Sequence, residues 1–262
     1  MQIVALTSNP ITGPEGRENR RALAVALEVG VDLIGGCPHL DPDGTMLMSD
    51  AFAAASDAGI GLDLHVDEVL DPQVLYLREL SRMVSDSGFA HPVTASHCVT
   101  LGLQSPDVQA AVSREVADAG VSVVALPQTN LFLQGRNHPT ATPRGLTAID
   151  ALSQAGALVC GGADNVQDPF NLVGRSDPLE TAALLVMAGH RLPDEAFRMG
   201  GADARTWRGL PPAEPVVGAV ADFVAIDAPS VRGAVADAPM ARKVFHRGKL
   251  VATTSQSRTI YR

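Results

Sequence analysis

Short runs of apolar residues alternate along most of the chain with longer stretches in which apolar positions recur at helical spacing. The runs are typical of strands buried in a parallel sheet, and the stretches between them are typical of helices that cover it. The pattern predicts strands at residues 2–6, 31–36, 61–65, 93–97, 121–126 and 157–161. It predicts helices at residues 15–29, 49–58, 71–85, 106–119, 146–154, 177–190 and 193–207.

Regular alternation of strands and helices predicts an α/β fold with a parallel sheet and right-handed crossovers. The usual closed form is a TIM-like (β/α) barrel, and we expect an incomplete one with about six of its eight units. A polar loop is expected at residues 128–144. After Gly209 the pattern predicts a strand at 219–227 and a hairpin at 241–252 that turns at Arg247-Gly248. We therefore expect a partial barrel over residues 1–208 and a small β appendage over residues 209–262.

Composition narrows the class of protein further. With 262 residues, 46% of them hydrophobic, the chain can bury a large core. A formal net charge of -9 argues against nucleic acid as a partner. Cys37, Cys98 and Cys160 lie far apart without metal or redox spacing, which indicates reduced thiols and a cytoplasmic location. The first residues carry no basic leader pattern, and no apolar run has membrane-spanning length, so we expect no membrane partner.

Polar side chains with metal-binding chemistry stand at the ends of predicted strands. They are His39, His65 with Glu68, His97 and Asp164. Because the carboxyl ends of parallel strands converge on one face of a barrel, we expect His65, His97 and Asp164 to meet there. Two imidazoles and a carboxylate suit Zn²⁺ or Fe²⁺, and Glu68 could move protons beside the metal. A chance coincidence of polar strand ends stays open, and a single histidine such as His39 is more often a hydrogen-bonded loop residue.

Other chemistries fit less well. The chain has no GxSxG nucleophile elbow, and its Gly35-Gly36 and Gly161-Gly162 pairs form neither a dinucleotide fingerprint nor a P-loop. Cys98 adjoins His97, but neighbouring strand residues point to opposite faces, which disfavours a thiol nucleophile paired with that histidine.

Four motifs carry a resemblance to a known family. They are Leu62-Asp-Leu-His-Val-Asp-Glu68, Val93-Thr-Ala-Ser-His97, Asn130-Leu-Phe-Leu-Gln-Gly-Arg136 and Cys160-Gly-Gly-Ala-Asp-Asn-Val-Gln-Asp-Pro169. In order and spacing they resemble bacterial cytosine deaminases and their relatives in the amidohydrolase superfamily. The C-terminal segments resemble the β-sandwich of that superfamily, so residues 209–262 would be a remnant of it.

The resemblance implies roles for individual residues. His65 and Asp164 would ligate one divalent metal ion, zinc or iron. Glu68 would shuttle protons between the activated water and the ring nitrogen of the substrate. His97 would hydrogen-bond the attacking oxygen, and Asp164 would also accept the proton of the water. The residues implied to border the substrate are Gln134, Arg136, Asn165 and Phe170.

The chain departs from the family pattern at three places. It has no His-x-His motif, and its first strand aligns with the third barrel strand, so we expect the first two strands to be missing. The glutamine that reads pyrimidines in the family is replaced here by Ser8. The second acid of the family's Asp-Asp pair is replaced by Asn165. With two expected ligands, metal binding by this chain should be weak.

These observations lead to one functional hypothesis and one alternative. The hypothesis is a metal-dependent amidohydrolase of the cytosine-deaminase type, which hydrolyses a C–N bond of a small nitrogen heterocycle with metal-activated water and forms a homo-oligomer. The alternative is a truncated, non-catalytic barrel remnant that binds a small ligand or assembles with a partner chain through its open sheet edges.

Overall fold

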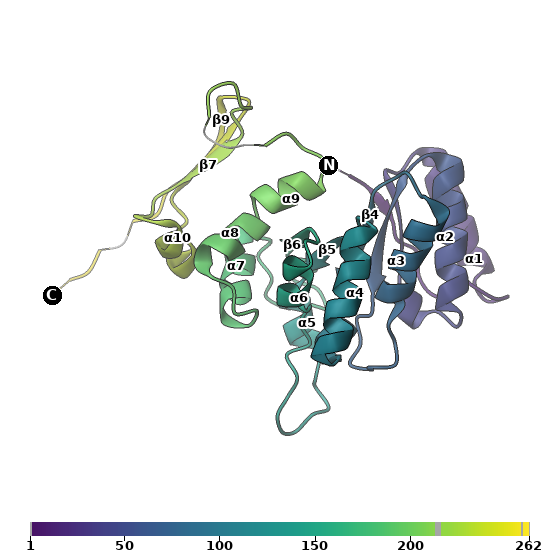
Figure 1. Ribbon diagram of the computed structural model, residues 1–262. Helices are drawn as coiled ribbons and strands as arrows, with labels where there is room; N and C mark the ends of the chain where they lie inside the picture. Colours follow the sequence, from purple (N-terminus) through teal and green to yellow (C-terminus); the bar gives the residue numbers. More distant parts are fainter. Residues whose placement is uncertain (1, 213–215, 258, 262) are drawn as a thin grey trace. The chain divides into compact units, whose positions relative to one another are not determined.

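One sheet organises the N-terminal part of the chain, and its strands follow one another in space as they do in sequence (Figure 1). The structure is a computed structural model that describes residues 2–212, 216–257 and 259–261. The strands are β1 (Val4–Ala5), β2 (Leu33–Gly36), β3 (Gly61–Val66), β4 (Val93–His97), β5 (Ser122–Ala125) and β6 (Val159–Gly161). β1 to β5 pair in parallel. The predicted fold class, an incomplete (β/α) barrel, is confirmed by this sequential order with helical crossovers.

Helices connect successive strands of this sheet. They are α1 (Arg17–Val29), α2 (Gly44–Ala58), α3 (Tyr76–Ser87), α4 (Pro106–Asp118), α5 (Pro127–Leu133) and α6 (Ile149–Gln154), with short 3₁₀ turns η1 (Pro38–Leu40) and η2 (Thr100–Leu103). Figure 1 shows α2, α3 and α4 side by side. Their apolar faces and the strands form the core, in which Leu62, Leu64, Leu77 and Leu80 are fully buried. Burial of such side chains is the main favourable contribution to the fold.

Helix α5 corrects one prediction. Residues 128–144 were expected to form a loop throughout, yet Pro127–Leu133 is helical. Pro127 stands in the first turn, where its missing N–H costs nothing. Gln128, Thr129 and Asn130 are buried in this helix although they are polar, so no apolar periodicity marks it in the sequence.

Two other predicted helices have different bounds in the structure, and the reasons are local. α2 begins at Gly44 instead of residue 49, because the Asp43 side chain accepts a hydrogen bond from the Met46 N–H and caps the helix. The single helix predicted at residues 193–207 is divided at Gly200 and Gly201 into α8 (Pro193–Met199) and α9 (Ala202–Trp207).

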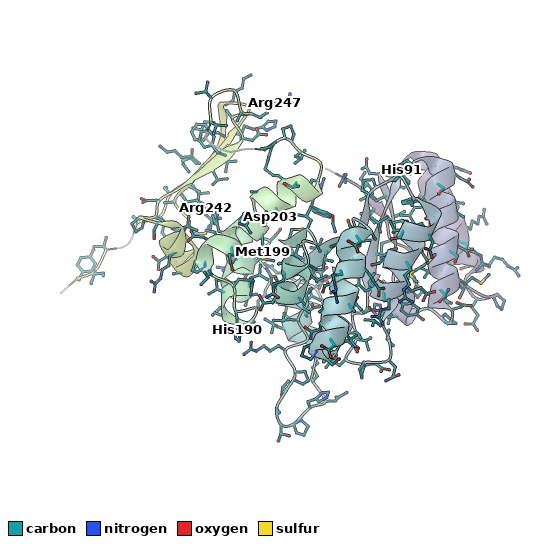
Figure 2. The ribbon with its side chains drawn as sticks, in the orientation of Figure 1. His91, His190, Met199, Asp203, Arg242 and Arg247 are labelled. Atoms are coloured by element: carbon teal, nitrogen blue, oxygen red, sulfur yellow. The ribbon has the colours of Figure 1, made fainter. Side chains whose placement is uncertain are left out.

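The C-terminal part contains a separate antiparallel sheet in the order β7-β8-β9. Its strands are β7 (Phe223–Ile226), β8 (Arg242–His246) and β9 (Lys249–Thr254), and its further helices are α7 (Pro178–Met187) and α10 (Val231–Asp237). The predicted hairpin is confirmed, with positive φ at Arg247 and Gly248 in its turn. Figure 2 shows Arg242 at the base of this hairpin and Arg247 at its tip. Helix α10 was not predicted.

The described residues form two compact units, Met1–Val159 and Cys160–Arg262. The predicted boundary at residues 208 and 209 falls inside the second unit and stays a prediction. Within that unit, both guanidinium Nη atoms of Arg242 bond the Asp177 carboxylate at 2.7 and 2.9 Å, which ties the start of α7 to β8. Among the described residues, none of the helices combines the length and the apolar character that crossing a membrane requires.

Candidate active site

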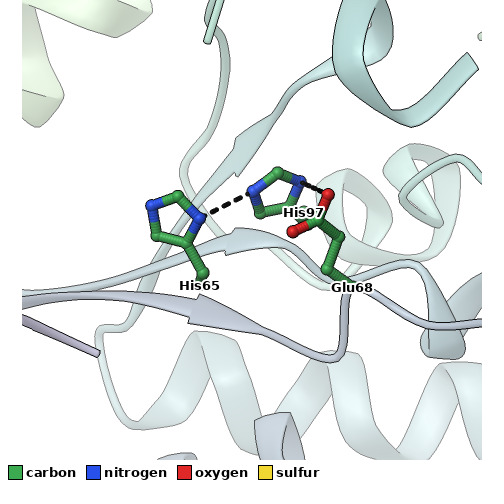
Figure 3. Close-up of side chains that lie close together, drawn as sticks. All are labelled: His65, Glu68 and His97. Atoms are coloured by element: carbon green, nitrogen blue, oxygen red, sulfur yellow. Dashed lines mark hydrogen bonds and ion pairs between the residues drawn. The ribbon is translucent and has the colours of Figure 1, made fainter. Parts of the chain in front are cut away.

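His65, Glu68 and His97 come together where β3 and β4 end (Figure 3). One potential ligand atom from each lies within 4.8 Å of the others. The strand register pairs His65 with Ser96 and Val66 with His97, so regular strands would place the two imidazoles on opposite faces. His97 instead has a left-handed φ of 68°, which breaks the alternation at the last residue of β4. The structure thus brings together His65 and His97, two of the three residues that were expected to meet, with Glu68 beside them.

Left-handed backbone is concentrated at these strand ends. Asp67 has φ 54°, and His97 and Cys98 have consecutive values of 68° and 48°. Non-glycine residues adopt such angles only where surrounding contacts hold them, and they cluster at functional sites. Here the Cys98 N–H donates to the Val66 carbonyl at 2.9 Å, and the Thr147 hydroxyl donates to the His97 carbonyl at 2.5 Å. The backbone on both sides of the His97 ring is thus held by hydrogen bonds.

The His97 ring is 1% exposed and has polar contacts at both nitrogens. Its Nδ1 lies 2.8 Å from Oδ1 of Asn130 and 3.5 Å from Oε1 of Glu68, and its Nε2 lies 3.0 Å from Nδ1 of His65. Burial lowers the pKa of His97 to about 3, with a smaller contribution from His65 and with the Asn130 hydrogen bond opposing it. The imidazole is therefore neutral at physiological pH.

His39 lies beside this group, in η1 directly after β2. A hydrogen bond to the backbone of His65 opposes the lowering of its pKa, and its Nδ1 is buried without a hydrogen-bond partner among the described residues. Burial lowers the pKa of His39 to about 4. The sequence favoured a simple loop residue here, whereas the structure places a third imidazole next to His65.

Cys37 is also near the cluster and was not singled out from the sequence. Burial raises its pKa to about 11, and the Glu68 charge adds to the shift, while a hydrogen bond with Asn9 opposes it. The thiol is therefore protonated at neutral pH. A protonated thiol next to a carboxylate is a weak hydrogen-bond donor rather than a nucleophile.

Asp67 adjoins Glu68 in the sequence, but its side chain stabilises the fold by capping a helix. Its side chain is fully buried, and its two carboxylate oxygens accept hydrogen bonds from the backbone N–H groups of Tyr76 and Leu77, at 2.8 and 3.0 Å. These bonds cap the first turn of α3, which explains why the helix begins at Tyr76 and not at residue 71. Burial raises the pKa of Asp67 to about 7, against the two hydrogen bonds that lower it. Glu68 differs from it in that 16% of its side chain is exposed and its Oε1 lies 3.5 Å from Nδ1 of His97.

The residues of the first unit that were expected to border the substrate differ in exposure and in their contacts with the cluster. Gln134 donates from Nε2 to the backbone carbonyl of Glu68 at 3.2 Å, so it adjoins the cluster. Arg136 is exposed, and its guanidinium lies 4.1 Å above the Phe132 ring. Ser8 is exposed just beyond β1. The substrate contacts assigned to these residues stay predictions.

Asp164, Asn165 and Phe170 belong to the second compact unit. Asp164 follows β6 with a left-handed φ of 58°. Asn165 donates to the Asp168 carboxylate at 2.5 Å, and Phe170 is 53% exposed. The predicted convergence of Asp164 with His65, and the metal and substrate roles of these three residues, stay predictions.

Asn130 is the buried residue at this site whose role the sequence did not indicate. It opens the motif at residues 130–136, but it was expected to lie in a loop. In the structure it is fully buried on α5 and its side chain contacts His97. Membership of a motif was the only signal that could have identified it.

The donor set of the cluster fits a divalent metal ion. Imidazoles and a carboxylate within 4.8 Å are ligands that Zn²⁺ and Fe²⁺ accept. His65 is the histidine of the pair whose second nitrogen, Nε2, is directed away from His97 (Figure 3). It is therefore the imidazole best placed to hold a metal.

Comparison with known proteins agrees with this site. The sequence profile of the amidohydrolase family matches residues 6–252. A pterin deaminase of Rhizobium rhizogenes is 36% identical over 225 residues, which cover 84% of this chain and 51% of that protein. The chain thus spans about half of the length of this curated relative.

Solved structures of two hydrolases are also similar to this chain. A 5-methylcytosine deaminase from Klebsiella pneumoniae, liganded with 5-fluorocytosine, is similar with a TM-score of 0.87 and 25% identity, over 99% of this chain and 64% of that one. An N-isopropylammelide isopropylaminohydrolase from Burkholderia multivorans has a TM-score of 0.77 and 29% identity, over 95% and 62% of the two chains. The match of the family profile over residues 6–252, with a curated relative 36% identical, shows that this chain belongs to the amidohydrolase family.

Proposed function

We propose that this chain is a metal-dependent aminohydrolase of the cytosine-deaminase type, which releases ammonia or an amine from a ring carbon of a nitrogen heterocycle. The observation that carries the proposal is the cluster of His65, Glu68 and His97, with one carboxylate and two imidazoles within 4.8 Å. The relatives support the substrate class. Pterin, 5-methylcytosine and N-isopropylammelide, which their names give, all contain a ring carbon that bears an amino group next to a ring nitrogen.

His65 and Asp164 would hold the metal, and Glu68 and His97 would act on the reactants. When bound, a divalent metal supplies a Lewis acid that makes water a better nucleophile. Glu68 takes a proton from the water and delivers it to the ring nitrogen as the oxygen adds to the carbon. His97 would form a hydrogen bond with the adding oxygen. The proton that remains on the added oxygen then passes to the amino nitrogen, the C–N bond breaks, and the products are a ring carbonyl and ammonia or an amine.

The proposal is tested by incubating the purified chain, loaded with Zn²⁺ or Fe²⁺, with pterin, 5-methylcytosine and N-isopropylammelide. Ammonia and isopropylamine are the products to quantify. We expect release from at least one ring, abolished by chelation and by His65→Ala. A folded chain that bound metal and released neither product from any of these rings would contradict the proposal. It would favour the alternative of a non-catalytic barrel that binds a small ligand or a partner chain.

A further inference from the structure

The Arg136 side chain is held against the end of α5 by two contacts. Its Nε donates to the Phe132 carbonyl at 2.8 Å, and its Cζ lies 4.1 Å from the centre of the Phe132 ring. That carbonyl belongs to the last turn of the helix, where backbone acceptors lack intrahelical donors. The two contacts hold the guanidinium group in place and use only one of its five N–H donors.

The outer edge of this guanidinium group has no anionic partner. Arg136 is exposed, and among the described residues it takes part in no ion pair and its two Nη groups have no hydrogen-bond partner. The four N–H donors that remain form the planar fork that matches a carboxylate. Because the fork is already held on the Phe132 ring, it loses little conformational freedom when it binds an anion.

The charge around Arg136 differs in sign from that of its unit as a whole. Asp and Glu far outnumber Arg in residues 1–159, and this part of the chain has no Lys. Residues 119–149, in contrast, contain Arg136 and Arg144 and neither Asp nor Glu. This segment is therefore a place where an otherwise acidic unit can attract an anion.

The base of the loop that follows α5 places Arg136 beside the candidate active site. Two residues before it, Gln134 donates from Nε2 to the Glu68 carbonyl at 3.2 Å. The far end of the loop returns to the same point, because Gly145 lies so close to the Gln134 side chain that a Cβ atom there would overlap with it. The loop thus begins and ends near Glu68, at the carboxyl edge of the sheet where ligands of such folds bind, and Arg136 belongs to its base.

We propose that Arg136 determines specificity, in that its Nη groups bind a carboxylate carried by the substrate, so that the chain prefers heterocycles with an acidic substituent. One guanidinium group balances one negative charge, which suits a carboxylate better than a phosphate group with nearly two charges. Arg136 is exposed whereas His97 in the cluster is buried, so the carboxylate would stand at the end of the substrate remote from the amino group that is released. The inference rests on the proposed function for the kind of ring that is bound.

The test compares pterin with the same ring system carrying a carboxylate on its pyrazine ring, away from the amino group. Isothermal titration calorimetry on the metal-free chain measures both affinities, and the absence of metal prevents the carboxylate from binding a metal ion instead. Benzoate shows whether a carboxylate binds without the heterocycle. The variants are Arg136→Gln, which removes the charge, and Arg136→Lys, which keeps the charge but not the fork.

Arg114→Gln is the matched control. Arg114 is also exposed, and its Nε also donates to the carbonyl four residues earlier, that of Ala110, at 3.1 Å. The control therefore removes the same charge and the same kind of backbone contact from the same unit. Arg114 lies on α4, outside the segment of residues 119–149.

We expect the native chain and Arg114→Gln to bind the carboxylated ring about 10-fold more tightly than pterin, the lower end of what hydrogen bonds between charged groups contribute. Arg136→Gln should bind the two rings with equal affinity, and Arg136→Lys should keep only part of the preference. Equal affinities in the native chain, or no binding of the carboxylated ring, would overturn the inference even if the Arg136 variants did not fold. So would a preference that survives in a folded Arg136→Gln, or benzoate binding as tight as that of the carboxylated ring.

Failure of the proposed function would give a different result. The native chain would then show the preference that depends on Arg136, yet it would release no ammonia from either ring when loaded with Zn²⁺ or Fe²⁺. A chain that released ammonia but bound both rings equally would refute only the role of Arg136.

Discussion

Nε2 of His97 and Nδ1 of His65 lie 3.0 Å apart, although 32 residues separate them in the sequence. The contact exists because β3 and β4 are neighbours and because the backbone of His97 leaves the strand conformation at its last residue. The His97 ring has polar contacts at both nitrogens, whereas Nε2 of His65 is directed away from His97 (Figure 3).

Replacing Glu68 by glutamine should reduce turnover without unfolding the protein. Glutamine keeps the shape of the side chain but cannot carry a proton, and general acid–base catalysis contributes about 10²- to 10⁴-fold. We expect a loss of kcat within that range, measured on the substrate found by the amine-release assay. Glu28→Gln, at an exposed position of α1, is the control and should keep full activity. Nearly native turnover in Glu68→Gln would refute the assignment of the proton shuttle.

Zn²⁺ should stabilise the folded chain through His65. A ligand that binds only the folded state adds about 2.7 kcal/mol when its concentration is a hundred times its Kd. We expect Zn²⁺ to raise the Tm of the native chain and of His138→Ala, in which an exposed loop histidine is removed. His65→Ala should show a much smaller rise in differential scanning fluorimetry. Equal shifts in all three proteins would place the bound metal elsewhere.

Removing the Asp67 carboxylate should destabilise the fold. Asp67→Ala leaves the backbone N–H groups of Tyr76 and Leu77 without their acceptors in a buried place. A lost helix cap costs about 0.5–2 kcal/mol, and we expect the upper part of that range for the free energy of unfolding in urea. Asp86→Ala, on the exposed face of α3, should change it by less than about 0.5 kcal/mol. Similar values for the two variants would contradict the capping role.

Acid should destabilise the protein through His97. Its pKa is lowered to about 3 in the folded chain, against about 6.5 for an unperturbed histidine. Between these values the unfolded chain binds the extra proton, so this contribution is fully present above about pH 6.5 and is lost as the pH falls toward 3. The slope should reach at most about 1.4 kcal/mol per pH unit.

Comparison with His97→Gln isolates that contribution, because His39 acts in the same direction in both proteins and Asp67 in the opposite one. The difference in the free energy of unfolding between the native chain and the variant should shrink as the pH falls. A difference that stayed constant from about pH 7 to pH 4 would show that His97 is not neutral in the folded state.

The positions of the main strands and of most helices were predictable from the sequence, because burial against a sheet imposes a periodicity that apolar residues display directly. The strand at residues 93–97 has its predicted bounds, and the helix beginning at Pro106 ends within one residue of its predicted end. Placing His65, Glu68 and His97 at one edge followed from the topology of parallel strands, in which separate carboxyl ends converge.

Only the tertiary structure decided how those side chains are held. The cap that begins α3 comes from Asp67, outside the helix, so no local signal at residues 71–76 could have shown it. His39 was expected to be a loop residue and instead contacts His65, because the neighbouring strands bring η1 and β3 together. Asn130 is polar and buried on a helix without apolar periodicity. Patterns along a chain report burial against solvent, whereas these contacts depend on which buried polar groups meet across elements far apart in sequence.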